Sequence, residues 1–77
     1  MTEDIAYRRA VAKRVRVWRA AEDQTQDDLA TSAGVTRNFV SAIERSTVGL
    51  DATRLRRLAT AMQMPLADLL ADPPERR

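Results

Sequence analysis

The sequence predicts an all-α fold of five helices, and three observations predict it. Apolar residues recur at helical spacing along the chain, and no segment shows the sustained alternation that is typical of a strand. Glycine occurs only at positions 34 and 49 and proline only at 65, 73 and 74, so the helix breakers fall between the helical segments and in the tail. The 77 residues are enough for one domain, 1–77, with one core.

The first helix is expected over Glu3–Ala21, with Thr2 as its N-cap. Val11, Val15 and Trp18 are three or four residues apart and therefore share one apolar face. We expect Trp18 to lie in the core rather than to stack on a nucleic-acid base.

The second helix is expected over Gln26–Ala33. Thr25 can cap it, and Asp28 at the third helical position can complete a capping box. Gly34 follows directly, where a left-handed residue ends a helix without a clash of Cβ.

The third helix is expected over Arg37–Arg45, with Thr36 as its N-cap. Val40 and Ile43 are expected to point inward, with Phe39 at the edge of the core. The spacing of these apolar residues leaves the polar side chains near the N-terminal end of this helix on its outer face.

The fourth and fifth helices complete the fold. Asp51 caps a helix over Ala52–Met62, whose inner face is expected to consist of Leu55, Leu58, Ala59 and Met62. Pro65 at the first helical position starts a short fifth helix, and Asp72-Pro73-Pro74 ends it. We expect the tail, 71–77, to be frayed.

The composition excludes several kinds of site. The chain contains no cysteine and no histidine, which excludes disulfides, Cys/His zinc sites, a cysteine nucleophile and any imidazole-dependent triad. So small a helical chain also offers little cavity for a carboxylate enzyme, so we expect no enzyme activity, no metal and no cofactor. The chain has neither an apolar run of about 18 residues nor a signal-peptide core, so we expect no membrane partner and a cytoplasmic, nucleoid-associated location.

Charge is distributed unevenly along the chain. The net charge is only +2, but six cations and no acid fall between Ile5 and Ala21, and four acids follow over 22–28. Basic and acidic patches that alternate in this way favour a polyanionic partner on one face. The alternative is an ordinary solvated helix surface.

Residues 26–45, QDDLATSAGVTRNFVSAIER, match the requirements of a helix-turn-helix. Ala30 is a small residue at the point where the two helices cross, and Gly34 suits the turn. Apolar residues stand at every position that this motif buries, namely Leu29, Ala33, Val35, Val40 and Ile43.

The outer face of the third helix opens with Arg37, Asn38 and Ser41 and carries no acid before Glu44. The arginine fork matches O6 and N7 of guanine, and an asparagine amide pairs with adenine. A helix used only for packing would carry Glu/Lys pairs on this face. The sequence therefore predicts that this helix reads base edges of DNA.

Residues 11–70 resemble the whole DNA-binding domain of the Xre-type family of phage repressors and Cro proteins. Within this family, TRNFVSAIER at 36–45 is similar to the recognition helix of controller proteins of restriction–modification systems, which reads Arg-Thr-Tyr-Ile-Ser-x-Ile-Glu-Arg. The resemblance implies a lambda-repressor-like fold with its core over 11–70. It also implies a homodimeric transcription regulator that binds pseudo-palindromic operators of its own gene and of the endonuclease gene. An antitoxin-type or phage repressor-like regulator that also binds a protein partner is the alternative.

The resemblance also implies roles for single residues. Glu44 is expected to pair with an arginine of the first helix, either Arg16 or Arg19. Asp27 and Asp28 fall where activating relatives contact RNA polymerase, but we favour the alternative that they cap their helix. The resemblance assigns Arg37, Asn38 and Ser41 to base edges of double-stranded operator DNA and Gln26, Thr36 and Arg45 to its backbone.

The resemblance to the family and the apolar content of the fourth and fifth helices imply a dimer contact there. One recognition helix reads only about four base pairs, and a two-fold dimer places two such helices about 34 Å apart. Some of the apolar residues there are expected to face the partner and others to seal the core of the monomer. The candidates are Met62, Met64, Leu66, Leu69 and Leu70.

Three departures from the family pattern stand at the ends of helices. Asp23-Gln24 replaces a glycine and an apolar residue, and Ser46 replaces a glycine or asparagine. Val48 stands where controller proteins often carry a polar or basic residue, so one phosphate contact is expected to be missing.

Overall fold

The computed structural model describes residues 5–49 and 51–71, which contain five helices and no strand. The all-α class is therefore confirmed. The predicted cap Thr2, the first two residues of the first helix and the tail from residue 72 onward lie outside the described residues. The helices are α1 (Ile5–Ala21), α2 (Gln26–Ala33), α3 (Arg37–Glu44), α4 (Ala52–Ala61) and α5 (Leu66–Leu69).

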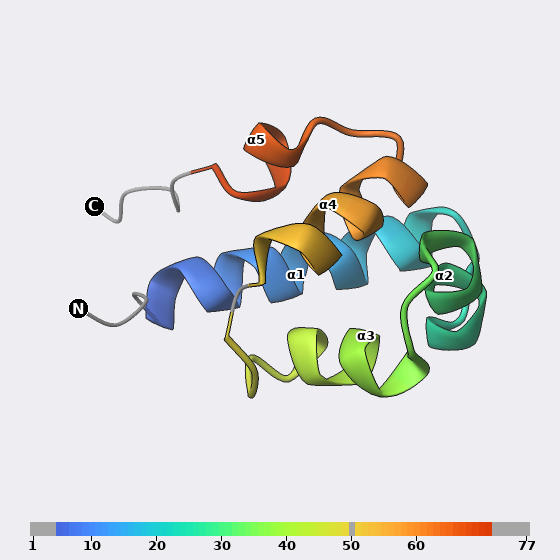
Figure 1. Ribbon diagram of the computed structural model, residues 1–77, viewed down its shortest axis with the longest axis horizontal. Helices are drawn as coiled ribbons and strands as arrows, with labels where there is room; N and C mark the ends of the chain where they lie inside the picture. The colour runs from blue at the N-terminus through green and yellow to red at the C-terminus, as the bar shows by residue number, and fades with distance from the viewer. Residues whose placement is uncertain (1–4, 50, 72–77) are drawn as a thin grey trace.

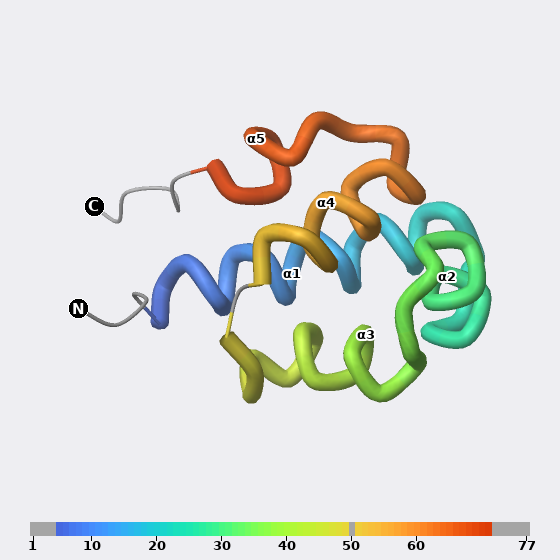
Figure 2. The backbone as a smooth tube through the Cα atoms, viewed as in Figure 1, coloured from blue at the N-terminus to red at the C-terminus, as the bar shows by residue number. Residues whose placement is uncertain are grey.

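The longest helix, α1, runs along the length of the molecule (Figure 1). α3 and α5 lie on opposite sides of it, α4 lies between them, and α2 stands at the end where α1 finishes. The backbone trace in Figure 2 shows the tight connection that carries the chain from α2 into α3. This arrangement leaves one long side of α3 free of other helices.

The core consists of the inner faces of the five helices. Trp18 is half-buried and packs against this core, as do Leu66 and Leu70. The prediction that Phe39 lies at the edge is wrong, since it is only 4% exposed. The reason is that the guanidinium of Arg54 on α4 covers its ring, 4.2 Å from the ring centroid. The largest fully buried side chains are Leu29, Ile43, Leu55, Leu58, Met62, Leu69, Val11, Val15 and Val40.

Side-chain caps start α2, α3 and α4, as predicted. Thr25 and Asp28 form a reciprocal capping box, with 3.0 Å from the Asp28 amide nitrogen to Thr25 Oγ1 and 3.0 Å from the Thr25 amide nitrogen to Asp28 Oδ2. Thr36 Oγ1 accepts a hydrogen bond from the Phe39 amide at 3.0 Å. Asp51 caps α4 by accepting hydrogen bonds from two amides of its first turn. The short segment between Gly34 and α3 is therefore defined by local hydrogen bonds.

Each of the helices α1 to α4 is followed, within two residues of its end, by a residue in the left-handed conformation. The φ angles of these residues are 56° at Asp23, 70° at Gly34, 58° at Ser46 and 57° at Gln63. In each case the amide of this residue donates to a carbonyl three residues back, and the next amide donates to a carbonyl five residues back. The prediction for Gly34 is confirmed, and three residues with side chains adopt a conformation that favours glycine.

Three predicted boundaries differ from the structure by one residue. Arg45 and Met62 are C-caps rather than the last residues of α3 and α4, and Pro65 is the N-cap of α5 rather than its first residue. The short α5 is tied to α1 by Arg14, whose Nη1 donates to the carbonyls of Leu69 at 2.8 Å and of Ala71 at 2.9 Å.

Candidate nucleic-acid interface

The N-terminal part of α3 presents its polar side chains away from the core. Thr36, Arg37 and Asn38 are exposed, whereas the two residues that follow them are buried. Ser41 is half-buried, and Arg45 is exposed at the other end of the helix. The residues that the sequence predicted as base and backbone contacts on this helix therefore share one accessible face.

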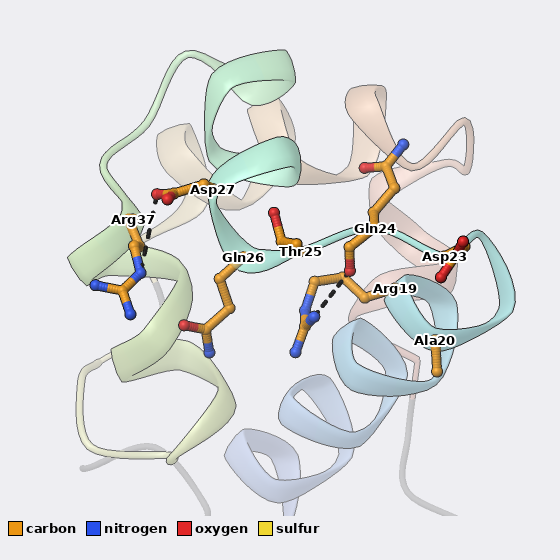
Figure 3. Close-up of a pocket in the computed structure, with 8 residues that line it drawn as sticks. All are labelled: Arg19, Ala20, Asp23, Gln24, Thr25, Gln26, Asp27 and Arg37. Atoms are coloured by element: carbon orange, nitrogen blue, oxygen red, sulfur yellow. Dashed lines mark hydrogen bonds and ion pairs between the residues drawn. The ribbon is translucent and has the colours of Figure 1, made fainter.

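Two arginines of this segment contact other side chains of the protein. The Nε of Arg37 lies 3.8 Å from Oδ1 of Asp27, and the two side chains are 62% and 74% exposed. Figure 3 shows Asp27, on the first turn of α2, facing Arg37 at the start of α3. Arg45 donates a hydrogen bond to the hydroxyl of Ser41. Exposed ion pairs contribute at most about 1 kcal/mol, so Arg37 can exchange its partner for a nucleic-acid group at little cost.

The acid of segment 36–45, Glu44, is turned away from the accessible face and is only 8% exposed. Arg19 clamps its carboxylate with two hydrogen bonds, Nε to Oε2 at 2.6 Å and Nη2 to Oε1 at 2.9 Å. The Nε2 of Gln26 donates to Oε1 at 3.1 Å. Arg16 donates instead to the backbone carbonyl of Glu44, at 2.7 Å. Of the two predicted partners of the carboxylate, Arg19 is therefore confirmed.

We call these four residues, Arg16, Arg19, Gln26 and Glu44, the polar joint, because they connect α1, α2 and α3. Burial by itself raises the pKa of the Glu44 carboxyl. The hydrogen bonds from Arg19 and Gln26, with the charges of both arginines, outweigh this effect and hold that pKa below its ordinary value. The hydrogen bond to Glu44 likewise raises the pKa of Arg19. The joint is therefore an ion pair at neutral pH, and its carboxylate does not oppose a polyanion at the outer face of α3.

A polar hollow of about 480 Å³ lies at the N-terminal end of α2, between Arg19 and Arg37 (Figure 3). Gln26, the predicted phosphate contact, lines this hollow, and its side-chain amide donates a hydrogen bond to the carboxylate of Glu44. The side-chain amide nitrogen of glutamine has two hydrogens, so Gln26 can donate one to Glu44 and the other to a phosphate outside the protein. The start of a helix also favours an anion, because its first amides and its dipole present positive charge.

The two acids on the first turn of α2 have different surroundings. Asp28 belongs to the capping box, which agrees with the capping role that the sequence favoured. Asp27 is exposed and faces Arg37 rather than a backbone amide of its own helix. It is therefore placed to influence the charge at the start of α3.

The predicted dimer residues divide into two groups. Met62 is 2% exposed and Leu69 is fully buried, so both belong to the core of the monomer. Their assignment to a dimer surface is corrected, because a buried side chain has no area left for a partner. Met64, Leu66 and Leu70 are half-buried and retain accessible apolar surface.

Sequence reasoning missed the roles of two arginines on α4. Arg54 covers the ring of Phe39, and Arg57 Nη1 donates to the carbonyl of Gly34 at 3.4 Å. Both contacts connect α4 to the helix-turn-helix. The two arginines are three residues apart and therefore share one side of α4, which the sequence could have shown. Only the packing of α4 shows which groups they contact. Val48 is half-buried and packs against the core.

The described residues contain no group of three or more side chains that could hold a metal ion. None of the helices found in these ranges is long and apolar enough to span a bilayer.

Comparison with known proteins identifies relatives of this architecture. Residues 11–69 match the helix-turn-helix family HTH_3. A Neisseria hypothetical transcription factor from Neisseria meningitidis serogroup B is 30% identical over 69 residues, or 90% of this chain, and the chain spans only 65% of that relative's length.

Two solved structures from other proteins have the same fold. The crystal structure of hypothetical transcription factor NHTF from Neisseria has a TM-score of 0.81 at 28% identity, covering 96% of this chain and 85% of its own. The restriction-modification controller protein C.AhdI from Aeromonas hydrophila has a TM-score of 0.75 at 27% identity, covering 80% and 94%.

Proposed function

Since this chain belongs to the HTH_3 family of helix-turn-helix proteins, it is a DNA-binding transcription regulator, and we propose that it acts as a homodimer on a pseudo-palindromic operator. One observation carries this proposal. The accessible face of α3 begins with Arg37 and Asn38, and the acid of the same segment is buried in the polar joint. A face of this kind attracts phosphate and offers two side chains that can distinguish bases.

On this proposal, Arg37, Asn38 and Ser41 contact base edges in the major groove. The arginine pairs with guanine and the asparagine with adenine, while Ser41 accepts or donates one hydrogen bond. A second group of polar side chains contacts phosphates and sets the angle of the helix in the groove, namely Gln26, Thr36 and Arg45.

A second copy of the chain is needed to recognise a DNA site of sufficient length. One such helix covers about four base pairs, so two copies related by a two-fold axis are needed for a half-site separation of about 34 Å. Met64, Leu66 and Leu70 are the candidates for the contact between copies, because they retain apolar surface on the side of α4 and α5.

The regulator acts, on this proposal, as the controller protein of a restriction–modification system, regulating its own gene and the endonuclease gene. The similarity to the controller protein C.AhdI supports this, as does the sequence of α3. Asp27, exposed on α2, is the candidate for a contact with RNA polymerase when the protein activates.

Footprinting and mobility shift on the DNA upstream of the gene test the proposal. We expect protection of two half-sites, affinity that falls steeply with salt, and binding that is cooperative in protein concentration. Methylase and endonuclease genes beside the gene are expected for a controller protein. Equal affinity for this DNA and for random competitor would overturn the proposal.

The variant Arg37→Ala tests the base contact. It is expected to lose about 1–3 kcal/mol of binding free energy and to relax the preference at one base pair of each half-site. The matched control is Lys13→Ala, which removes a cation from a part of α1 that faces away from α3. An equal loss on every sequence would assign Arg37 to the DNA backbone instead.

A further inference from the structure

An open groove of about 570 Å³ runs along α1, from Ala10 to Ala21, and is closed on one side by Met64 from the turn between α4 and α5. The polar joint and the outer face of α3 do not line it. No part of the proposed DNA contact accounts for this groove, and of the three candidates for the contact between copies only Met64 lines it.

The groove lies on the side of α1 opposite α3. Arg16 and Arg19 mark the side that meets α3, because both bind Glu44. At about 100° per residue, Val17 and Ala21 fall on the other side of the same helix. An occupant of the groove would therefore leave the outer face of α3 accessible to DNA.

The surface of the groove is apolar. Val17 is 56% exposed and, with Ile5 at 54%, is one of two large apolar side chains exposed among the described residues. Trp18 and Met64 are half-buried beside it, so each also leaves apolar surface in the groove. The two alanines at its ends keep α1 narrow there, which permits close approach of another backbone.

The rim of the groove is basic. Lys13 and Arg14 line it, and α1 contains no Asp or Glu between Ile5 and Ala21. A second copy bound through this groove about a two-fold axis would bring these cations close to their own counterparts, which is unfavourable. A partner with carboxylates around an apolar stripe has the complementary charge.

The shape favours an elongated occupant. The distance from Ala10 to Ala21 along the helix is about 16 Å, or three turns, and the groove is open along this length rather than enclosed. Short amphipathic helices bind grooves of this kind through apolar side chains one turn apart. We infer that the α1 groove binds a short acidic amphipathic helix of a partner protein, which packs on Val17, Trp18 and Met64. This inference goes beyond the DNA-binding function, and it requires that Leu66 and Leu70 make the contact between copies and leave Met64 accessible.

The test uses Trp18, the single tryptophan of the chain, as an intrinsic fluorescent probe. The full chain is titrated with a synthetic helical peptide of about 14 residues that has leucines on one face and glutamates on the others. A peptide with lysines in place of the glutamates is the charge control. We expect saturable binding of the acidic peptide with a shift in tryptophan emission, and at least about tenfold weaker binding of the basic one.

Two variants of equal exposure on the same helix localise the binding. Val17→Glu is expected to weaken binding of the acidic peptide at least about tenfold, because it places a carboxylate in the groove. Ile5→Glu adds the same charge outside the groove and is expected to leave the affinity within about twofold. Circular dichroism and operator mobility shift establish that both variants fold and bind DNA.

Three results would overturn the inference. The first is equal binding of the acidic and basic peptides, or equal effects of the two variants. The second is a Val17-dependent affinity for vesicles of phosphatidylglycerol and phosphatidylcholine in the absence of peptide binding, which would assign the groove to a membrane surface. The third is a shift of the protein from dimer to monomer in Val17→Glu but not in Ile5→Glu, measured by ultracentrifugation, which would assign the groove to a second copy.

Discussion

The proposed recognition helix α3 and helix α4 are held in the fold by different kinds of contact. α3 buries Val40 and Ile43 but is also clamped at its end by the polar joint, with three hydrogen bonds to one carboxylate. α4 is attached mainly by fully buried leucines such as Leu55 and Leu58. The hydrophobic effect does not depend on the relative orientation of the buried groups. A bidentate arginine–carboxylate pair, in contrast, requires one relative orientation of its two side chains. We therefore expect the buried leucines of α4 to contribute more to stability than the polar joint does, and we expect the polar joint to set the angle of α3.

The largest expected effect is on the apolar side. Leu58→Ala removes a fully buried side chain, and we expect it to lower the free energy of unfolding by about 2–5 kcal/mol, measured by urea denaturation. The DNA affinity of the folded fraction is expected to stay close to that of the unmodified protein. Thr60→Ala, an exposed change on the same helix, is the control. A loss below about 1 kcal/mol would show that the buried leucines of α4 do not contribute more to stability than the polar joint does.

A smaller loss of stability, with a larger effect on function, is expected at the polar joint. Glu44→Gln keeps the shape but weakens the hydrogen bonds from Arg19, and we expect it to cost about 1.5–3 kcal/mol of unfolding free energy. The folded fraction is expected to bind operator DNA less tightly, because α3 loses its fixed angle. Glu22→Gln, an exposed change at the end of α1, controls for charge. Unchanged operator affinity in Glu44→Gln would refute the division of roles between the two sides.

The polar joint also predicts how stability depends on pH. Because the pKa of Glu44 is lower in the folded protein than in the unfolded chain, its contribution is complete above the ordinary carboxyl pKa of about 4.3. That contribution is lost as pH falls through the lower folded value. Denaturation from pH 7 to pH 3 should show stability decreasing at the acidic end, with a weaker decrease in Glu44→Gln than in the unmodified protein. Parallel curves for the two proteins would contradict the pKa shift.

The smallest effects are expected at the left-handed residues that end the helices. Gly34→Ala meets no atom within 4 Å of the added Cβ, so its cost is only that of the positive φ, about 1 kcal/mol. Gln63→Gly after α4 relieves the same strain, and we expect a gain on the order of 0.5 kcal/mol after the added entropy of the unfolded chain. Ser46→Gly after α3 should gain less, because the Ser46 hydroxyl lies 3.5 Å from the carbonyl of Arg8. Thermal denaturation of the three variants ranks these effects.

Much of the fold was predictable because its signals are local. The caps at Thr25, Thr36 and Asp51 and the turn at Gly34 depend on hydrogen bonds within a few residues, and the structure confirms each of them. The left-handed conformation of Gln63 was not predictable in the same way, because nothing in a glutamine indicates positive φ. Its conformation allows the amides of Gln63 and Met64 to donate to the carbonyls of Thr60 and Ala59 at the end of α4.

The exposure of Arg37 and Asn38 was predictable from the sequence, but the contacts between helices around them were not. Periodicity placed Arg37 and Asn38 on the outside of α3, and the structure agrees. The burial of Phe39 was missed because the group that covers it, Arg54, lies on another helix. Met62 and Leu69 were misassigned for the same reason. Helical spacing alone could not show whether these side chains are buried in the monomer or accessible to a partner.

The sequence by itself determined the helices, the turn between α2 and α3, and the polar side chains that open α3, because caps, glycine geometry and helical periodicity act over a few neighbouring positions. Only the tertiary structure decided that Arg19 rather than Arg16 clamps Glu44, which of the candidate dimer residues remain accessible, and that α1 presents an apolar groove with a basic rim. These features depend on the distance and angle between helices far apart in the chain, which are set by the packing of the whole core.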